Sequence, residues 1–114
     1  MKKTTKYASK LALGTLLAGS LIGGSARADA GATWSANCAA CHGKDGKGGT
    51  MMGRKLSIKD LTDPAVQSSF TDADATKAIK EGVTDNGTQK MMAFGGKLSD
   101  DDIKALVAYI RSLK

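Results

Sequence analysis

Histidine, cysteine and aromatic side chains are scarce in this chain, and their scarcity limits the chemistry available to it. The 114 residues include one histidine, His42, and two cysteines, Cys38 and Cys41. A single imidazole excludes any site that needs two histidines from one chain. Three soft or imidazole ligands, two of them adjacent, are also too few for a structural zinc centre. Aromatic residues make up 4% of the chain, so protein side chains alone would build only a modest core.

Long hydrophobic runs are also absent, except near the N-terminus, where one has the form of an export signal. Lysines at positions 2 to 10 precede an apolar run over residues 11–26, and Ala26-Arg27-Ala28 fits a signal-peptidase site. We therefore predict a cleaved secretory signal over residues 1–28 and one domain over residues 29–114, with cleavage after Ala30 as the alternative. A retained membrane anchor is disfavoured, because a span needs about 20 apolar residues and glycines interrupt this run.

The predicted signal contains no acidic residue, and this changes the meaning of the net charge. The whole chain has 17 basic and 11 acidic residues, a formal charge of +6. Five of the basic residues lie before Asp29, which leaves the mature domain with 12 basic and 11 acidic residues. The basic isoelectric point therefore reports the signal, and it does not indicate a nucleic-acid partner.

The most informative motif present is Cys38-Ala39-Ala40-Cys41-His42, the pattern by which haem is attached covalently to protein. The two thiols can add to the two vinyl groups of one porphyrin as thioethers. The imidazole that follows is then held under the iron as its proximal ligand. We predict one haem c bound by Cys38, Cys41 and His42, which would also supply much of the missing core.

The remaining pattern is helical, and no stretch alternates convincingly with a period of two residues. We expect a first helix over about residues 31–40, a glycine-rich loop after His42, and a second helix that opens at Thr71 and stops at Gly82. A last helix is capped by Ser99. Its apolar stripe consists of Ile103, Leu106, Val107, Ile110 and Leu113. The predicted fold class is all-α.

The second axial position of the iron is open on these observations, because His42 occupies only one face. The alternatives for this position are a methionine thioether, a lysine amine, the N-terminal amine, water or no ligand. Four methionines follow the predicted signal: Met51, Met52, Met91 and Met92. Met51 follows His42 so closely that ligation by it would leave the middle of the chain nothing to enclose. Met91 and Met92 come after a helix and a loop.

The segment Met91-Met92-Ala93-Phe94-Gly95-Gly96, followed by a leucine and a capped helix, resembles the axial-methionine segment of class I c-type cytochromes. The resemblance implies a small cytochrome c fold in which three main helices and their loops wrap one haem. It also implies that Met91 is the distal ligand, with Met92 as the second choice. Met92 stands where that family commonly has a proline, and Ala30 stands where it usually has a glycine.

The resemblance further implies a function. We expect an exported single-haem electron carrier, in the periplasm, the thylakoid lumen or the extracellular space. It would be a monomer that exchanges electrons with redox proteins, with no enzymatic activity and no membrane span after cleavage. Two competing interpretations are a haem enzyme or gas sensor with a displaceable sixth ligand, and a thiol redox protein. The second lacks the βαβ pattern of thioredoxin-like proteins.

Overall fold

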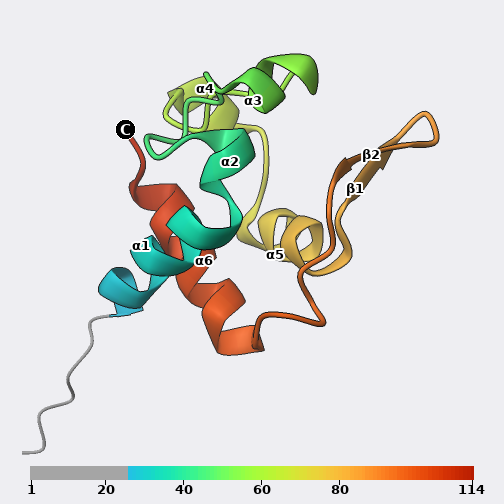
Figure 1. Ribbon diagram of the computed structural model, residues 1–114. Helices are drawn as coiled ribbons and strands as arrows, with labels where there is room; N and C mark the ends of the chain where they lie inside the picture. The colour runs from blue at the N-terminus through green and yellow to red at the C-terminus, as the bar shows by residue number, and fades with distance from the viewer. Residues whose placement is uncertain (1–25) are drawn as a thin grey trace, which may run out of the picture.

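The computed structural model describes residues 26–114, and their arrangement is shown in Figure 1. The predicted signal peptide lies outside the described residues, apart from its last three, which form the start of the first helix. The elements in chain order are α1 (Ala26–Asn37), α2 (Ala39–His42), α3 (Met51–Lys55), α4 (Pro64–Ser68), α5 (Asp72–Glu81), β1 (Val83–Asp85), β2 (Thr88–Met91) and α6 (Asp100–Ser112). The expected all-α class, with three main helices, is confirmed by α1, α5 and α6.

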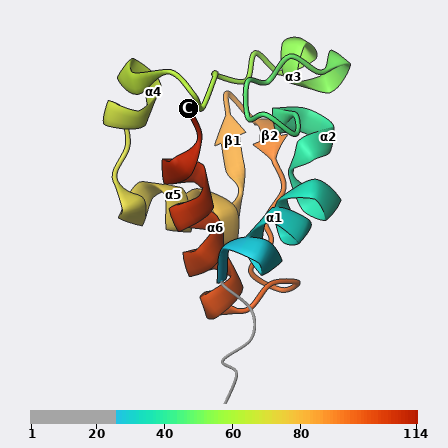
Figure 2. The ribbon, with the colours of Figure 1, turned by 90° about the vertical axis from the view of Figure 1, so that its left-hand side faces the viewer.

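The core forms where α1 and α5 pack against α6 (Figures 1 and 2). Its most deeply buried side chains are Trp34, Ile103 and Leu106. Ala30, at the start of α1, is also buried, and a Cβ on the next residue, Gly31, would already lie 3.8 Å from the Tyr109 ring. The small residues of α1 therefore let it approach α6 closely.

The last helix follows its sequence pattern closely. Ser99 caps α6, and Asp102 completes a capping box by accepting a hydrogen bond from the Ser99 backbone N–H. Four members of the expected stripe are buried: Ile103, Leu106, Val107 and Ile110. The fifth, Leu113, lies just past the end of the helix and packs on the edge of the core. Within the described range, no helix combines the length and apolar character needed to span a membrane.

A two-stranded antiparallel hairpin, β1–β2, joins α5 to the segment that follows Met91, and the sequence pattern had indicated no strand here. The turn is formed by Asn86 and Gly87, whose φ angles of 48° and 76° are both left-handed. Two successive left-handed residues form a type I′ turn, for which Asn-Gly is a favoured pair. The strands are short, mostly polar and largely exposed, so they carry no alternation of apolar residues that would reveal them.

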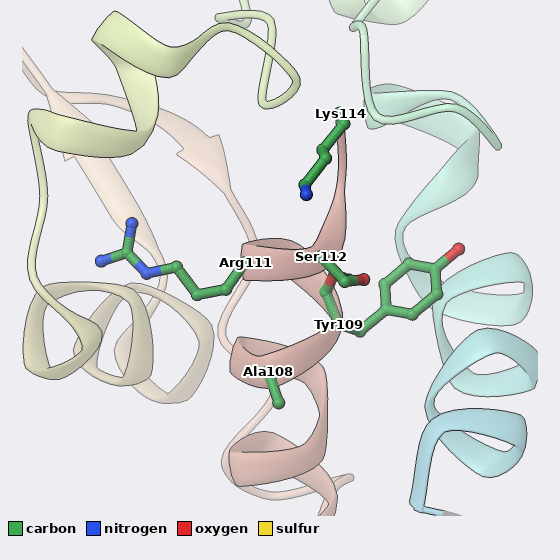
Figure 3. Close-up of a pocket in the computed structure, with 5 residues that line it drawn as sticks. All are labelled: Ala108, Tyr109, Arg111, Ser112 and Lys114. Atoms are coloured by element: carbon green, nitrogen blue, oxygen red, sulfur yellow. Dashed lines mark hydrogen bonds between the residues drawn. The ribbon is translucent and has the colours of Figure 1, made fainter.

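Arg111 ties the C-terminal end of α6 to the segment between α4 and α5. Its guanidinium pairs with Asp72 at 2.7 Å, donates to the carbonyl oxygens of Gln67 and Phe70, and lies over the Phe70 ring. Beside it lies a shallow pocket of about 610 Å³. Figure 3 shows that two of its lining residues, Arg111 and Tyr109, point to opposite sides of α6. None of the predicted site residues lines this pocket. The Arg111 guanidinium beside it is already paired with Asp72.

Replacing the cap of α6 tests this description of the fold. Ser99→Ala should lower the free energy of unfolding by about 1 kcal/mol, because the first turn of the helix loses the acceptor for one free N–H. Denaturant unfolding of the mature protein measures the change. Ser99→Thr keeps the hydroxyl and should retain most of the stability, so an equal loss in both variants would contradict the capping role.

Candidate haem site

The Cys38–His42 motif forms one helical turn at the junction of α1 and α2. The Cys38 N–H donates to the Trp34 carbonyl at 2.8 Å, and the His42 N–H donates to the Cys38 carbonyl at 2.9 Å. On such a turn, residues three and four apart lie on one face. The spacing of the motif therefore places both thiols and the imidazole on the same side of the chain.

Trp34 orients the histidine end of this turn. Its indole N–H donates to the Gly43 carbonyl at 2.9 Å, directly after His42. Its ring also packs against the His42 imidazole, with the two centroids 5.5 Å apart. The end of α2 is thereby fixed to the most buried side chain of α1.

The state of His42 fits iron ligation. Burial lowers the pKa of the imidazole, which keeps the ring neutral, the form that binds metals. Nδ1 is buried and has no hydrogen-bond partner among the described residues. A buried ring nitrogen without a partner costs free energy, so its burial here calls for a functional explanation. Iron ligation through the other ring nitrogen, Nε2, would supply one.

The two cysteines are half-buried and form no disulfide in the described chain. Burial, and secondarily the nearby Cys41, raise the pKa of the Cys38 thiol to about 11. Thiols that act in disulfide exchange have lowered pKa values, since the thiolate is the nucleophile. The raised pKa of Cys38 therefore argues against the alternative of a thiol redox protein.

Thr50 and Gly53 lock the following segment onto the motif, and sequence reasoning missed both. The Thr50 hydroxyl donates to the Cys41 carbonyl at 2.7 Å and accepts from the Gly53 N–H at 2.9 Å, so it also caps α3. A Cβ on Gly53 would overlap the carbonyl oxygens of Cys41 and Gly48. The sequence did offer one sign of this helix cap, a threonine three residues before a glycine. Such a pattern is weak evidence in a loop that contains many glycines.

The four methionines occupy different environments. Met51, Met92 and Met52 are exposed by 88%, 62% and 44%. Met91 is half-buried and packs against the core cluster, which Cys38 also contacts. Met91 is thus the methionine that shares a core with the haem-attachment motif.

Hydrogen bonds to α5 hold the segment after Met91, in the region where the family's proline is missing. The N–H groups of Phe94 and Gly95 donate to the carbonyls of Ile79 and Lys80 at 2.8 and 3.1 Å. The Phe94 side chain is buried in the core. Gly95 permits this approach, because a Cβ there would lie 2.9 Å from the Lys80 carbonyl oxygen.

Comparison with known proteins gives a consistent result. Residues 25–110 match the family described as cytochrome C oxidase, cbb3-type, subunit III. The chain is 39% identical over 79 residues to the cytochrome c6 of Bumilleriopsis filiformis, covering 69% of this chain and 81% of that protein. It is 36% identical over 98 residues to the cbb3-type cytochrome c oxidase subunit FixP of Azorhizobium caulinodans, covering 85% of this chain but only 31% of that subunit.

A solved structure shares the fold. The KustC0563 c-type cytochrome superimposes with a TM-score of 0.67 and 30% sequence identity, covering 75% of this chain and 96% of that one. The likeness therefore extends over nearly the whole of that protein.

The contact between Gly53 and the motif can be tested by substitution. Gly53→Ala should destabilise the mature, haem-loaded protein by about 2 kcal/mol, because the added methyl group forces α3 away from the Cys41 carbonyl. Gly49→Ala is the matched control, since a Cβ at that position meets nothing within 4 Å. Denaturant unfolding of both variants provides the comparison, and equal stabilities would show that the close approach at Gly53 is unimportant.

Proposed function

Since this chain belongs to the c-type cytochrome family, we propose that its electron-transfer function depends on a single haem c held by the Cys38–His42 motif and by Met91. When bound, the haem supplies one-electron chemistry by cycling between ferrous and ferric iron. The chain's own residues would attach the group and supply a protein ligand on each side of the iron.

The proximal side of the proposed site is built from one turn of chain. Cys38 and Cys41 would hold the porphyrin through two thioethers, formed by addition of each S–H across one vinyl group with no by-product. Neutral His42 would be the protein ligand to the iron, and its contact with the Trp34 ring restricts rotation of the imidazole. Covalent attachment prevents loss of the haem from a protein that works outside the cytoplasm.

The distal ligand in this proposal is Met91. The observation that carries the choice is burial: Met91 packs on the core that Cys38 contacts, whereas the Met92 side chain is 62% exposed. A thioether is a soft ligand that favours ferrous iron and so raises the reduction potential. With a protein ligand on each side of the iron, no substrate would need to reach it, and the proposed protein is a carrier rather than an enzyme.

Export places the proposed carrier in the periplasm or thylakoid lumen, or on the extracellular side of a membrane. The support is the predicted signal over residues 1–28, which is basic and then apolar. In these compartments, we propose that the mature domain acts as a monomer between a donor and an acceptor that are themselves redox proteins. The formal charge of residues 29–114 is close to zero, so net charge alone favours redox partners of neither sign.

Two substitutions test the ligand assignment. Met91→Ala should convert the haem to high-spin, abolish the weak far-red absorption band of methionine-ligated ferric iron and lower the reduction potential. Met92→Leu should leave all three nearly unchanged, because its side chain is directed away from the core. Absorption spectra and a potentiometric titration of the purified mature proteins provide these readouts.

Two outcomes would overturn the assignment. If Met92→Leu loses the far-red band and Met91→Ala keeps it, Met92 is the ligand. If the unaltered protein is already high-spin in the ferric state, the sixth position is open. The protein then fits the alternative of a haem enzyme or gas sensor.

A further inference from the structure

The β1–β2 hairpin has no evident role in the core. Its strands are largely exposed, Figure 1 shows it projecting from the body of the molecule, and none of residues 83–90 belongs to the core cluster or packs against it. Yet its second strand ends on Met91. We propose that the hairpin is a positioning device for Met91, so that the Asn86-Gly87 turn determines how tightly this methionine holds the iron. The inference rests on the proposed ligand.

The register of the hairpin decides which way Met91 faces. Thr84 pairs with Gln89, whereas Val83 pairs with Met91, which leaves Lys90 as an extra, bulged residue. Cross-strand partners share a face of a sheet and successive residues alternate. In a regular strand, Met91 would therefore lie on the same face of the sheet as Gln89, which is exposed. The bulge instead places Met91 with Val83 on the opposite face, a common effect of bulges beside functional sites.

The base of the hairpin is fitted closely to the Met91 backbone. Gly82, which ends α5, has a φ of 77°, and a Cβ there would lie 2.6 Å from the Met91 carbonyl oxygen and 2.9 Å from the Ala93 nitrogen. Beyond Met91, the Phe94 N–H is bonded to the Ile79 carbonyl. Met91 is thus held on its C-terminal side by α5, and on its N-terminal side by strand pairing within the hairpin.

The turn can be disturbed without touching anything else. Asn86 and Gly87 are both exposed, and a Cβ on Gly87 would meet no atom within 4 Å. An alanine at this position acts only through its backbone, because the left-handed conformation at φ 76° is unfavourable for residues other than glycine. Any effect at the iron must then be transmitted through the strands.

Gly87→Ala in the haem-loaded mature protein tests the inference. Imidazole displaces a weakly held methionine from ferric iron, so its affinity reports the strength of the Met91 bond. We expect the affinity to rise about fivefold, from the strain of one left-handed alanine, with a weaker far-red band. Backbone amides of residues 83–91 should exchange faster with solvent. Asn86→Gly, which tolerates the same backbone, should leave all three readouts unchanged.

Two controls separate a local effect from general destabilisation. The first control is Gly96→Ala, on the C-terminal side of Met91. A Cβ there also meets nothing within 4 Å and the backbone is not left-handed, so imidazole affinity should not change. Ser99→Ala weakens α6 and the whole fold without touching the hairpin, and it should leave imidazole affinity unchanged.

Contrary outcomes are distinguishable. If Gly87→Ala speeds amide exchange in the hairpin but leaves imidazole affinity unchanged, the hairpin does not position Met91 and the inference is wrong. It is equally wrong if Ser99→Ala raises the affinity as much as Gly87→Ala does. Met91→Ala is measured alongside, since a far-red band that survives in that variant refutes the proposed ligand itself, independently of the hairpin.

Discussion

The position of Trp34 is the constraint on which the rest of the structure depends. Its side chain is 1% exposed, its ring contacts both His42 and Tyr109, and its N–H is satisfied by the Gly43 carbonyl. One residue thereby joins the packing of α1 against α6 to the orientation of the haem-binding turn. In a chain with so few aromatic residues, burial of this one indole both builds the core and aims the imidazole.

The two sides of the site are constructed differently. The proximal side is local: the motif, Thr50 and Gly53 lie within 16 residues of one another and interact through backbone groups. The segment that carries Met91, the proposed distal ligand, is assembled over a longer stretch of chain, from the end of α5, the hairpin and the Phe94 segment. Closing a short loop costs less conformational entropy than closing a long one, so the segment around the motif is the less costly of the two to order.

Much of this could be predicted from the sequence, and the reasons are specific. The Cys38–His42 motif predicted covalent attachment of a haem. Ser99 and the apolar stripe that follows it predicted a last helix, which the structure confirms as α6. The hairpin was missed because its strands are short and polar, although Asn86-Gly87 is a strong local turn signal. The interactions of Arg111 with Asp72 and Phe70 join residues about 40 positions apart, and no local pattern announces such a contact.

The exposure of the hairpin tip has an evolutionary consequence. Core residues such as Ile103 and Leu106 are constrained on all sides, so changes there alter folding before they alter redox behaviour. Asn86 and Gly87 are free of such packing, so a substitution in this turn strains the hairpin but leaves the core contacts intact. With the hairpin positioning Met91 as we propose, a lineage could adjust the strength of the methionine–iron bond by editing two surface residues, and leave its interior untouched.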